Sequence, residues 1–379
     1  MPLTCHNGLP RRFAPRNDDA GAPPAKIPVS ILTGFLGSGK TTLLNRILRE
    51  PGFERTAVIV NEFGDIGIDH DLIDASDDAV VLLENGCLCC AVRSDLVATL
   101  SSLHQRRAQG SIHAFDRVVI ETSGLAEPTP VLEVLLSEPS VNARFVPAGI
   151  VTTVDAVNAA ATLDAHIESV QQIALADRVV ITKTDLPDLP GASVQALQDR
   201  VRALNPQAQI VLASDSQEAG ALLRFTPQQL LSHGWSEASP DEAALAHGQQ
   251  HTPAHQHAQH DRRIQRLSIV RDDPWDLRTL ELLLDALSQN AGPNMLRVKG
   301  IIAIEEEPTR PVVLHGAQNL VHKLEWLAQW PSADRRTRIM FITRDIPAAQ
   351  VRDIIDAIER LSSRTRQARL RAAPSDQLI

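Results

Sequence analysis

Short apolar runs alternate with amphipathic helical patterns along the chain as far as Ser232. The apolar runs predict strands at Pro28–Thr33, Ala57–Asn61, Val80–Leu83, Arg117–Ile120, Ala148–Val154 and Arg178–Thr182. Between them, apolar residues recur on one helical face and predict helices at Lys40–Leu48, Asp95–Arg106, Thr129–Leu136, Asp164–Leu175 and Ala192–Leu204. Strands that are apolar on both faces and alternate with helices indicate an α/β fold with a mostly parallel, doubly wound sheet.

The alternating pattern stops after Ser232, and the chain of 379 residues is long enough for two domains. Residues 233–263 are rich in His, Gln, Ala and Glu, which is typical of a solvated linker. Residues 264–361 again contain short apolar runs and helical patterns, and they predict a smaller α+β C-terminal domain. The first domain is therefore expected at 26–232. Residues 1–25 lack periodicity and predict a disordered extension, and 362–379 form a basic tail.

Composition narrows the class of protein. Apolar residues make up 43% and charged residues 22% of the chain, and the formal net charge is −9, so its charge gives no reason to expect a nucleic-acid partner. No apolar run reaches the roughly 18 to 20 residues that would span a bilayer, so no membrane association is expected. The N-terminal arginines precede no apolar segment, so a secretory signal is not expected either. These features favour the cytoplasm, where cysteines stay reduced.

A phosphate-binding loop follows the first predicted strand. The segment Gly34–Thr41 matches the pattern GxxxxGK[ST] and leads into an amphipathic helix. Such a loop turns backbone N–H groups towards phosphates, and the helix N-terminus adds positive potential. Lys40 is expected to neutralise the β- and γ-phosphates, and the Thr41 hydroxyl is expected to ligate Mg²⁺. The nucleotide-binding residues predicted here are Gly34, Gly37, Ser38, Gly39, Lys40, Thr41 and Thr42.

Two later strand ends supply candidates for the rest of a nucleotide site. Glu121 closes the run Arg117–Ile120 and is expected to support the magnesium, while Gly124 would let a backbone N–H approach the γ-phosphate. The second strand end reads Thr182-Lys183-Thr184-Asp185, one letter from the NKxD element of GTPases. A carboxylate at Asp185 can accept two hydrogen bonds from guanine and Lys183 can lie along the base; alternatively, Asp185 only caps the next helix.

Three of the four cysteines lie in the segment Gly86-Cys87-Leu88-Cys89-Cys90. These thiolates are too close together for unstrained disulfides but could grip one soft metal ion; alternatively, they are buried structural cysteines. Glu62 is the favoured fourth ligand, ahead of His70 and His113, because it follows a strand and could reach the nucleotide side of the sheet. The His-rich linker could collect metal loosely or be only a polar connection.

Taken together, these residues resemble the CobW-type metallochaperone GTPases. The resemblance rests on GFLGSGKTT at 34–42, NEFG at 61–64, GCLCC at 86–90, ETSGLAEP at 121–128 and TKTD at 182–185, and in the second domain on LRVKGI at 296–301, VVLHG at 312–316 and RTRIMFITR at 336–344. It implies a P-loop NTPase domain that hydrolyses GTP, with metal bound by Cys87, Cys89 and Cys90 in a site organised by Mg-GTP. It also implies release of the metal to a client metalloprotein.

The same resemblance leaves several points open. Thr182 stands where the family element has Asn, which alters the support that this position gives to the base-reading loop. Thiolates with a carboxylate do not separate Zn²⁺ from Co²⁺; zinc is favoured and cobalt remains possible. A non-catalytic metal buffer that keeps the nucleotide fold and an ATP-dependent small-molecule kinase are the alternative functions. The sequence does not indicate the client or the oligomeric state.

Overall fold

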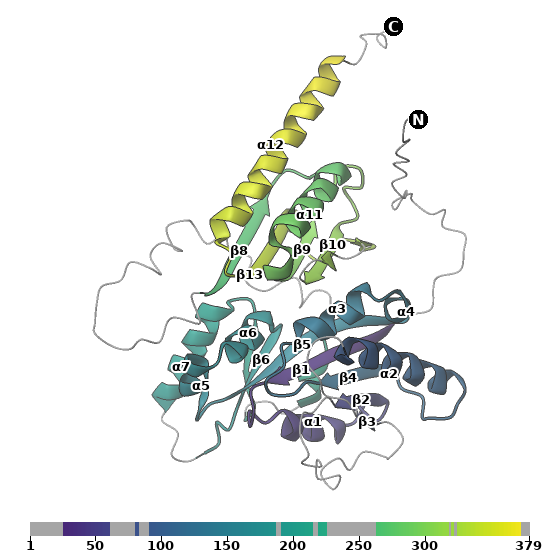
Figure 1. Cartoon of the computed structure of the whole chain (residues 1–379), viewed down its shortest axis with the longest axis vertical. Helices are drawn as coiled ribbons and strands as arrows, with labels where there is room; N and C mark the ends of the chain where they lie inside the picture. The colour runs from purple at the N-terminus through teal and green to yellow at the C-terminus, as the bar shows by residue number, and fades with distance from the viewer. Residues whose placement is uncertain are drawn as a thin grey trace, which may run out of the picture.

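The computed structural model of the chain describes residues 26–60, 80–82, 91–186, 191–214, 219–225, 263–317, 320–321 and 324–372. These residues form two layered units, each built on its own sheet, as Figure 1 shows. The predicted N-terminal extension at 1–25 and nearly all of the predicted His-rich linker at 233–263 lie outside the described residues.

The first unit contains a seven-stranded sheet in which every pairing is parallel. In spatial order its strands are β3 (Val80–Leu82), β2 (Thr56–Val60), β4 (Arg117–Glu121), β1 (Ile27–Gly34), β5 (Phe145–Asp155), β6 (Arg178–Thr182) and β7 (Gln209–Leu212). The parallel α/β prediction is confirmed. Strand β7 was not predicted, because only four residues form it and Gln209 is exposed. Parallel strands bring their carboxyl ends to one edge, where sites of this fold class form.

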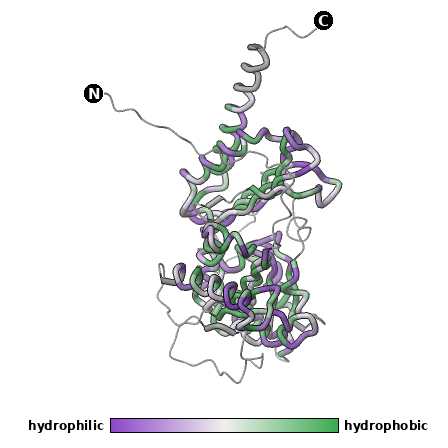
Figure 2. The backbone as a smooth tube through the Cα atoms, turned by 90° about the vertical axis from the view of Figure 1, so that its right-hand side faces the viewer, coloured by the Kyte–Doolittle hydropathy of each residue, from purple (hydrophilic) through white to green (hydrophobic). Residues whose placement is uncertain are grey.

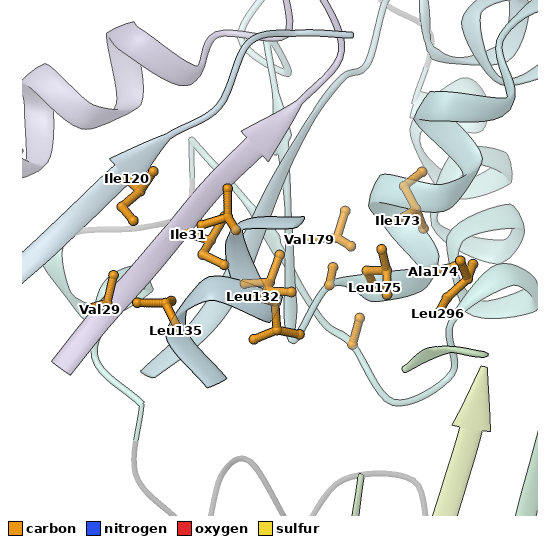
Figure 3. Close-up of a cluster of buried hydrophobic side chains, with 14 of the residues drawn as sticks. Val29, Ile31, Ile120, Leu132, Leu135, Ile173, Ala174, Leu175, Val179 and Leu296 are labelled. Atoms are coloured by element: carbon orange, nitrogen blue, oxygen red, sulfur yellow. The ribbon is translucent and has the colours of Figure 1, made fainter. Parts of the chain in front are cut away.

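Helices cover both faces of this sheet. On one face α1 (Lys40–Leu48) packs together with the short η2 helix (Ala219–Leu223). The other face is covered by α2 (Ala91–Ala108), α3 (Thr129–Ser137), α4 (Pro139–Asn142), α6 (Ile167–Leu175) and α7 (Gly191–Leu204). Ile31 and Val29 of the central strand β1 lie in the latter core (Figure 3).

The single helix predicted at Asp164–Leu175 is wrong. The chain forms α5 (Ala159–Ala165) and α6, separated by His166, whose backbone is extended with φ −130° and ψ 111°. The His166 ring lies against the Phe35 ring, with 4.5 Å between the ring centroids. The break between α5 and α6 therefore coincides with a contact between His166 and the loop after β1. The apolar periodicity of the sequence gives no sign of this break.

The second unit is an antiparallel sheet with helices on it. Its strands are β8 (Ile264–Arg271), β9 (Met295–Ile302), β10 (Val312–Ala317), β11 (Leu320–Val321), β12 (Glu325–Trp326) and β13 (Thr337–Arg344), and its helices are α11 (Leu277–Ala291), η3 (Gly292–Asn294) and α12 (Ala348–Ala372). Because α12 continues to Ala372, the part of the predicted basic tail at 362–372 is helical. In Figure 2 the strands of this sheet are largely apolar and the connections around them hydrophilic. None of the described helices is long and apolar enough to cross a membrane.

Apolar and ionic contacts join the two units. Leu296 of β9 and Met340 of β13 belong to the same buried cluster as the sheet face of the first unit, and Figure 3 shows Leu296 beside Ala174 of α6. Next to this cluster the Asp177 carboxylate pairs with Arg297 and Lys299 of β9 at 2.8 Å and 2.7 Å. The second unit is thus fixed against the connection from α6 to β6, the strand that ends at the candidate base-reading loop.

Candidate functional site

The phosphate loop lies between the end of β1 and the first turn of α1. Gly37 and Gly39 have φ values of +71° and +89°, which favour glycine because a Cβ is strained there. A Cβ on Gly34 would collide with Thr153 of β5. The Ser38 hydroxyl lies 2.7 Å from the Thr153 hydroxyl, which ties the loop to the sheet. This geometry leaves the loop and the positive end of α1 facing the sheet edge, where a phosphate could bind.

Two side chains at the start of α1, those of Lys40 and Thr41, form hydrogen bonds within the candidate nucleotide site. The Lys40 ammonium donates to the carbonyl oxygens of Gly34 and Phe35 at 3.1 Å and 3.3 Å, so the cation lies over the loop. The Thr41 hydroxyl donates to Glu121 Oε1 at 2.7 Å, and Glu121, at the end of β4, is only 2% exposed. A hydroxyl and a carboxylate are hard oxygen ligands of the kind that Mg²⁺ prefers. Thr41 and Glu121 could therefore hold that ion, directly or through its water.

The segment after β4 packs tightly against the phosphate loop. A Cβ on Gly124 would lie 2.6 Å from the backbone nitrogen of Leu36, so only glycine allows this approach. The Gln172 amide donates to the carbonyl oxygens of Gly124 and Ala126 at 3.2 Å and 3.0 Å and holds the segment from the α6 side. The structure thus brings Gly124 beside the loop, as its expected role near the γ-phosphate requires. Gln172 was not predicted, because nothing in a helical Gln indicates a distant backbone partner.

The segment after β6 is also tied to the phosphate loop. The Thr182 hydroxyl donates to the Ser38 carbonyl oxygen at 2.7 Å, so Thr at this position braces the loop. Lys183 has a φ of +58° and its ammonium pairs with Asp155 at 2.7 Å. Asp185 follows in an exposed position, where a base could reach its carboxylate.

Asp155 is a site residue that the sequence reasoning missed. It ends β5, beside Lys183, and also accepts from the Val157 amide and the Asn158 side chain, each at 2.8 Å. Burial alone would raise the pKa of Asp155, but the hydrogen bonds from Lys183, Asn158 and Val157 outweigh it and hold the pKa below its usual value. The signal was available, because an acid that closes an apolar run is the feature that indicated Glu121.

The candidate metal ligands Cys87, Cys89, Cys90, Glu62 and His70 lie outside the described residues, and His113 is exposed. Within the described ranges, no cluster of three or more His, Cys, Asp or Glu side chains could hold a metal ion.

The structure describes the strands that precede the cysteines and Glu62, β3 and β2. Val60 ends β2 and pairs in register with both Leu82, which ends β3, and Glu121. The chain therefore leaves β2 and β3 at the sheet edge that carries Glu121 and the phosphate loop, which is where a shared metal site requires both segments to begin.

Asp185 offers a direct test of nucleotide recognition. If its carboxylate accepts two hydrogen bonds from guanine, Asp185→Ala should weaken GTP binding by about 1 to 3 kcal/mol, roughly 5- to 150-fold, and leave ATP binding nearly unchanged. Titration of fluorescent guanine and adenine nucleotides would measure both affinities. Asp199→Ala, at an exposed acid on α7, is the matched control. Equal affinity of the unmodified protein for GTP and ATP would contradict the assignment.

Two family models match the chain, and together they span both units. The model described as CobW/HypB/UreG, nucleotide-binding domain, matches residues 28–212. The model described as cobalamin synthesis protein cobW C-terminal domain matches residues 264–359. The first match contains the phosphate loop and the segment after β6, and the second contains all described strands of the antiparallel sheet and its helices as far as residue 359.

Known proteins resemble the chain over nearly its whole length. The zinc chaperone YjiA of Escherichia coli (strain K12) is 30% identical over 326 residues, covering 86% of this chain and 96% of the relative. The zinc chaperone CobW of a Sinorhizobium species is 28% identical over 372 residues, covering 89% and 99%. The crystal structure of Zn(II)-bound YjiA GTPase from E. coli matches with a TM-score of 0.62 at 25% identity, covering 88% of this chain and 99% of that one.

Proposed function

The chain belongs to the CobW/HypB/UreG family and carries a CobW C-terminal domain, and we propose that it is a GTP-hydrolysing metallochaperone. In this proposal Zn²⁺, or alternatively Co²⁺, binds to Cys87, Cys89 and Cys90, the CxCC cysteines, when Mg-GTP is bound. Hydrolysis then permits delivery of the metal to a client metalloprotein. The reducing cytoplasm is the proposed location, because thiolates there remain free to bind metal.

The hydrogen bond between Thr41 and Glu121 is the observation that carries the nucleotide part of the proposal. It brings a hydroxyl from the phosphate loop and a buried carboxylate from a neighbouring strand within 2.7 Å of each other. Phosphoryl transfer depends mainly on charges held in position and on oxygen ligands that bind the metal ion. The Thr41 hydroxyl and the Glu121 carboxylate already lie together and supply both. A fold that kept only a structural Gly-rich turn would have no need of this pairing.

Each residue of the site has a proposed role in GTP hydrolysis. The backbone N–H groups of the loop and Lys40 bind the phosphates, and Lys40 neutralises charge that develops on the transferring group. Thr41 and Glu121 hold Mg²⁺, which when bound withdraws charge from the phosphate oxygens. The Gly124 N–H approaches the γ-phosphate and loses this contact when hydrolysis releases the phosphate. Lys183 and Asp185 select the base, and Thr182 keeps their loop against the phosphate loop.

The metal site is proposed to form from Cys87, Cys89, Cys90 and Glu62. Thiolates favour Zn²⁺ among available soft ions, and a carboxylate completes a four-ligand set. Support comes from the strand ends, since β2 and β3 stop in register at the edge that carries Glu121. A γ-phosphate with its Mg²⁺ can order neighbouring segments, so nucleotide state and metal affinity become linked.

This linkage gives the test of the proposed function. A non-hydrolysable GTP analogue should raise Zn²⁺ affinity over that measured with GDP by a coupling of about 1 to 3 kcal/mol, roughly 5- to 150-fold. By reciprocity, Zn²⁺ should raise affinity for the analogue by the same factor. Chelator-competition titrations with Zn²⁺ and Co²⁺, each with Mg-analogue, Mg-GDP and no nucleotide, measure both directions.

A cysteine variant separates metal binding from nucleotide binding. Changing Cys87, Cys89 and Cys90 to Ser should remove tight metal binding and leave GTP binding in metal-free buffer nearly unchanged, because the phosphate loop needs no thiolate. Changing Cys5, the remaining cysteine, to Ser is the matched control and should leave both affinities unchanged. Equal metal affinities with the analogue and with GDP would reject the switch and favour the metal-buffer alternative.

A further inference from the structure

A cavity lies between the two units, away from the phosphate loop. Its volume is about 390 Å³, within the range of small-molecule sites. Leu132 and Leu136 of α3 and Val146 to Ala148 of β5 give it an apolar wall, and β9 and β10 of the second unit close it from the other side. It occupies the amino-terminal half of the sheet, whereas the nucleotide site lies at the carboxyl ends of the strands.

The strand β5 is shaped around this cavity. Pro147 pairs with Val29 and Gly149 pairs with Ser30, so Ala148 has no partner on β1 and forms a bulge. Residues 146 to 148 remain half-buried although the rest of β5 is buried. A bulge in the interior of a sheet commonly re-aims side chains beside a site. Here the bulge forms part of the cavity lining, together with Leu132 and Leu136 of α3.

The charged end of the cavity holds more positive than negative charge. Arg297 and Lys299 of β9 line it together with Asp177, and the three side chains are only 8%, 6% and 6% exposed. Both oxygens of Asp177 already accept from Arg297, at 2.9 Å and 2.8 Å, and further bonds come from Lys299 and the Ile150 amide. One carboxylate therefore serves the two cations of β9, and the buried Arg178 guanidinium interacts with the same carboxylate, so positive charge exceeds negative charge in this cluster.

Lys299 has hydrogen-bonding capacity to spare. An ammonium carries three donors, and across the described parts of the chain the structure gives it one acceptor, Asp177 Oδ1 at 2.7 Å. Burial lowers the pKa of Lys299, and the Arg297 charge lowers it further against the opposing effect of Asp177. An anionic acceptor beside Lys299 would accept hydrogen bonds from its unused N–H groups. It would also reduce the repulsion between the Lys299 and Arg297 charges.

We propose that this cavity binds a small organic monoanion, with its apolar body between α3 and β5 and its charged head on Lys299. A negatively charged head complements the excess of positive charge in the cluster, and Lys26 adds a further cation to the lining of the cavity. The apolar wall selects a hydrocarbon body over a free inorganic anion, because burying that body contributes favourable free energy in proportion to its area. No residue of the phosphate loop and none of residues 182–185 lines this cavity.

Octanoate is the probe for this site, measured by isothermal titration calorimetry on the full chain without nucleotide. Saturable one-to-one binding is expected, with a dissociation constant of about 1 mM or tighter. Octan-1-ol has a similar body without the charge and acetate has the charge without the body, so both should bind at least about ten-fold more weakly. Absence of saturable octanoate binding, or equal binding of octan-1-ol, would overturn the proposal.

Two variants test the two ends of the cavity separately. Lys299→Met removes the head contact and leaves Asp177 paired with Arg297, and it should weaken octanoate binding about ten-fold or more. Ala148→Leu fills the apolar part, leaves the charges in place and should weaken binding similarly. Arg202→Met removes an exposed charge on α7 and should change nothing. Should Lys299→Met fail to fold, Ala148→Leu decides alone; octanoate affinity that survives either folded variant contradicts the assignment.

Discussion

Lys40→Ala is expected to lower the rate constant for GTP hydrolysis about 10³-fold or more. The ammonium is buried over the phosphate loop, within 3.1 Å of the Gly34 carbonyl oxygen. There it would meet charge that grows on the transferring phosphoryl group, and in a site with little water such a contact is worth much more than at the surface. Single-turnover phosphate release with saturating Mg-GTP measures the effect on the chemical step.

The control for this experiment is Arg202→Ala, which removes an exposed cation on α7 that pairs with Asp199. It should hydrolyse GTP at the unmodified rate. Circular dichroism and a thermal unfolding curve should show that Lys40→Ala remains folded, because Ala is a good residue for the start of a helix. If the folded Lys40→Ala protein still hydrolysed GTP at a near-normal rate, the catalytic site would lie elsewhere in the chain.

The elements around the phosphate loop could be predicted from the sequence because local signals coincide there. The apolar run before Gly34 and the periodicity after it agree, and the predicted bounds Lys40–Leu48 are those of α1. Strand β6 likewise has the predicted bounds Arg178–Thr182, since its apolar run is closed on both sides by polar residues. Where periodicity, strand length and turn residues point to the same result, local sequence is sufficient.

The missed features depend on contacts between distant residues. Asp155 closes an apolar run, as Glu121 does, but its partner Lys183 is 28 residues away, and Gln172 bonds to the backbone at Gly124, 48 residues away. Strand β5 begins at Phe145, three residues before the predicted start, because the Pro147 and Ala148 bulge interrupts its pattern. None of these contacts leaves a periodic trace in the sequence.

The junction between the two units was equally invisible to sequence patterns. Asp177 lies before β6, whereas Arg297 and Lys299 lie on β9, 120 and 122 residues further along the chain. A strand pattern with charges at alternate positions normally indicates a solvated face. Here the face is covered by the first unit, so the alternation of Arg297 and Lys299 marks a buried ionic contact instead.

Asp177→Asn is expected to destabilise the protein by about 3 to 5 kcal/mol. The replacement has nearly the same shape but no charge, so Arg297 and Lys299 would remain buried without their counter-ion. Urea unfolding followed by far-ultraviolet circular dichroism should show a lower midpoint. Because two units need not unfold together, the midpoint of each resolved transition should be compared.

A surface ion pair of the same residue types provides the control. Asp345 pairs with Arg263 at 2.7 Å, but their side chains are 44% and 48% exposed. Exposed pairs contribute about 0 to 1 kcal/mol, so Asp345→Asn should change the midpoint little. Asparagine also tolerates the φ of +58° at this position, which avoids a separate backbone effect. Equal destabilisation by the two variants would show that burial of the Asp177 cluster does not increase its contribution to the free energy of unfolding.

The pH dependence separates the charge of Asp177 from its packing. Burial alone would raise the pKa of Asp177, but Arg297 and Lys299 outweigh burial and hold the pKa far below its usual range. A carboxyl with a lowered pKa stabilises the folded state fully above its unfolded-state pKa of about 3.9, and this contribution is lost as the pH falls towards the folded-state value. The contribution of the Asp177 charge to the difference in unfolding free energy between the unmodified protein and Asp177→Asn should therefore be fully present above about pH 5 and decrease below about pH 4. Other carboxyl groups titrate in both proteins and cancel from the difference. A difference as large at pH 3 as at pH 7 would assign the effect to hydrogen-bond geometry rather than to the charge of Asp177.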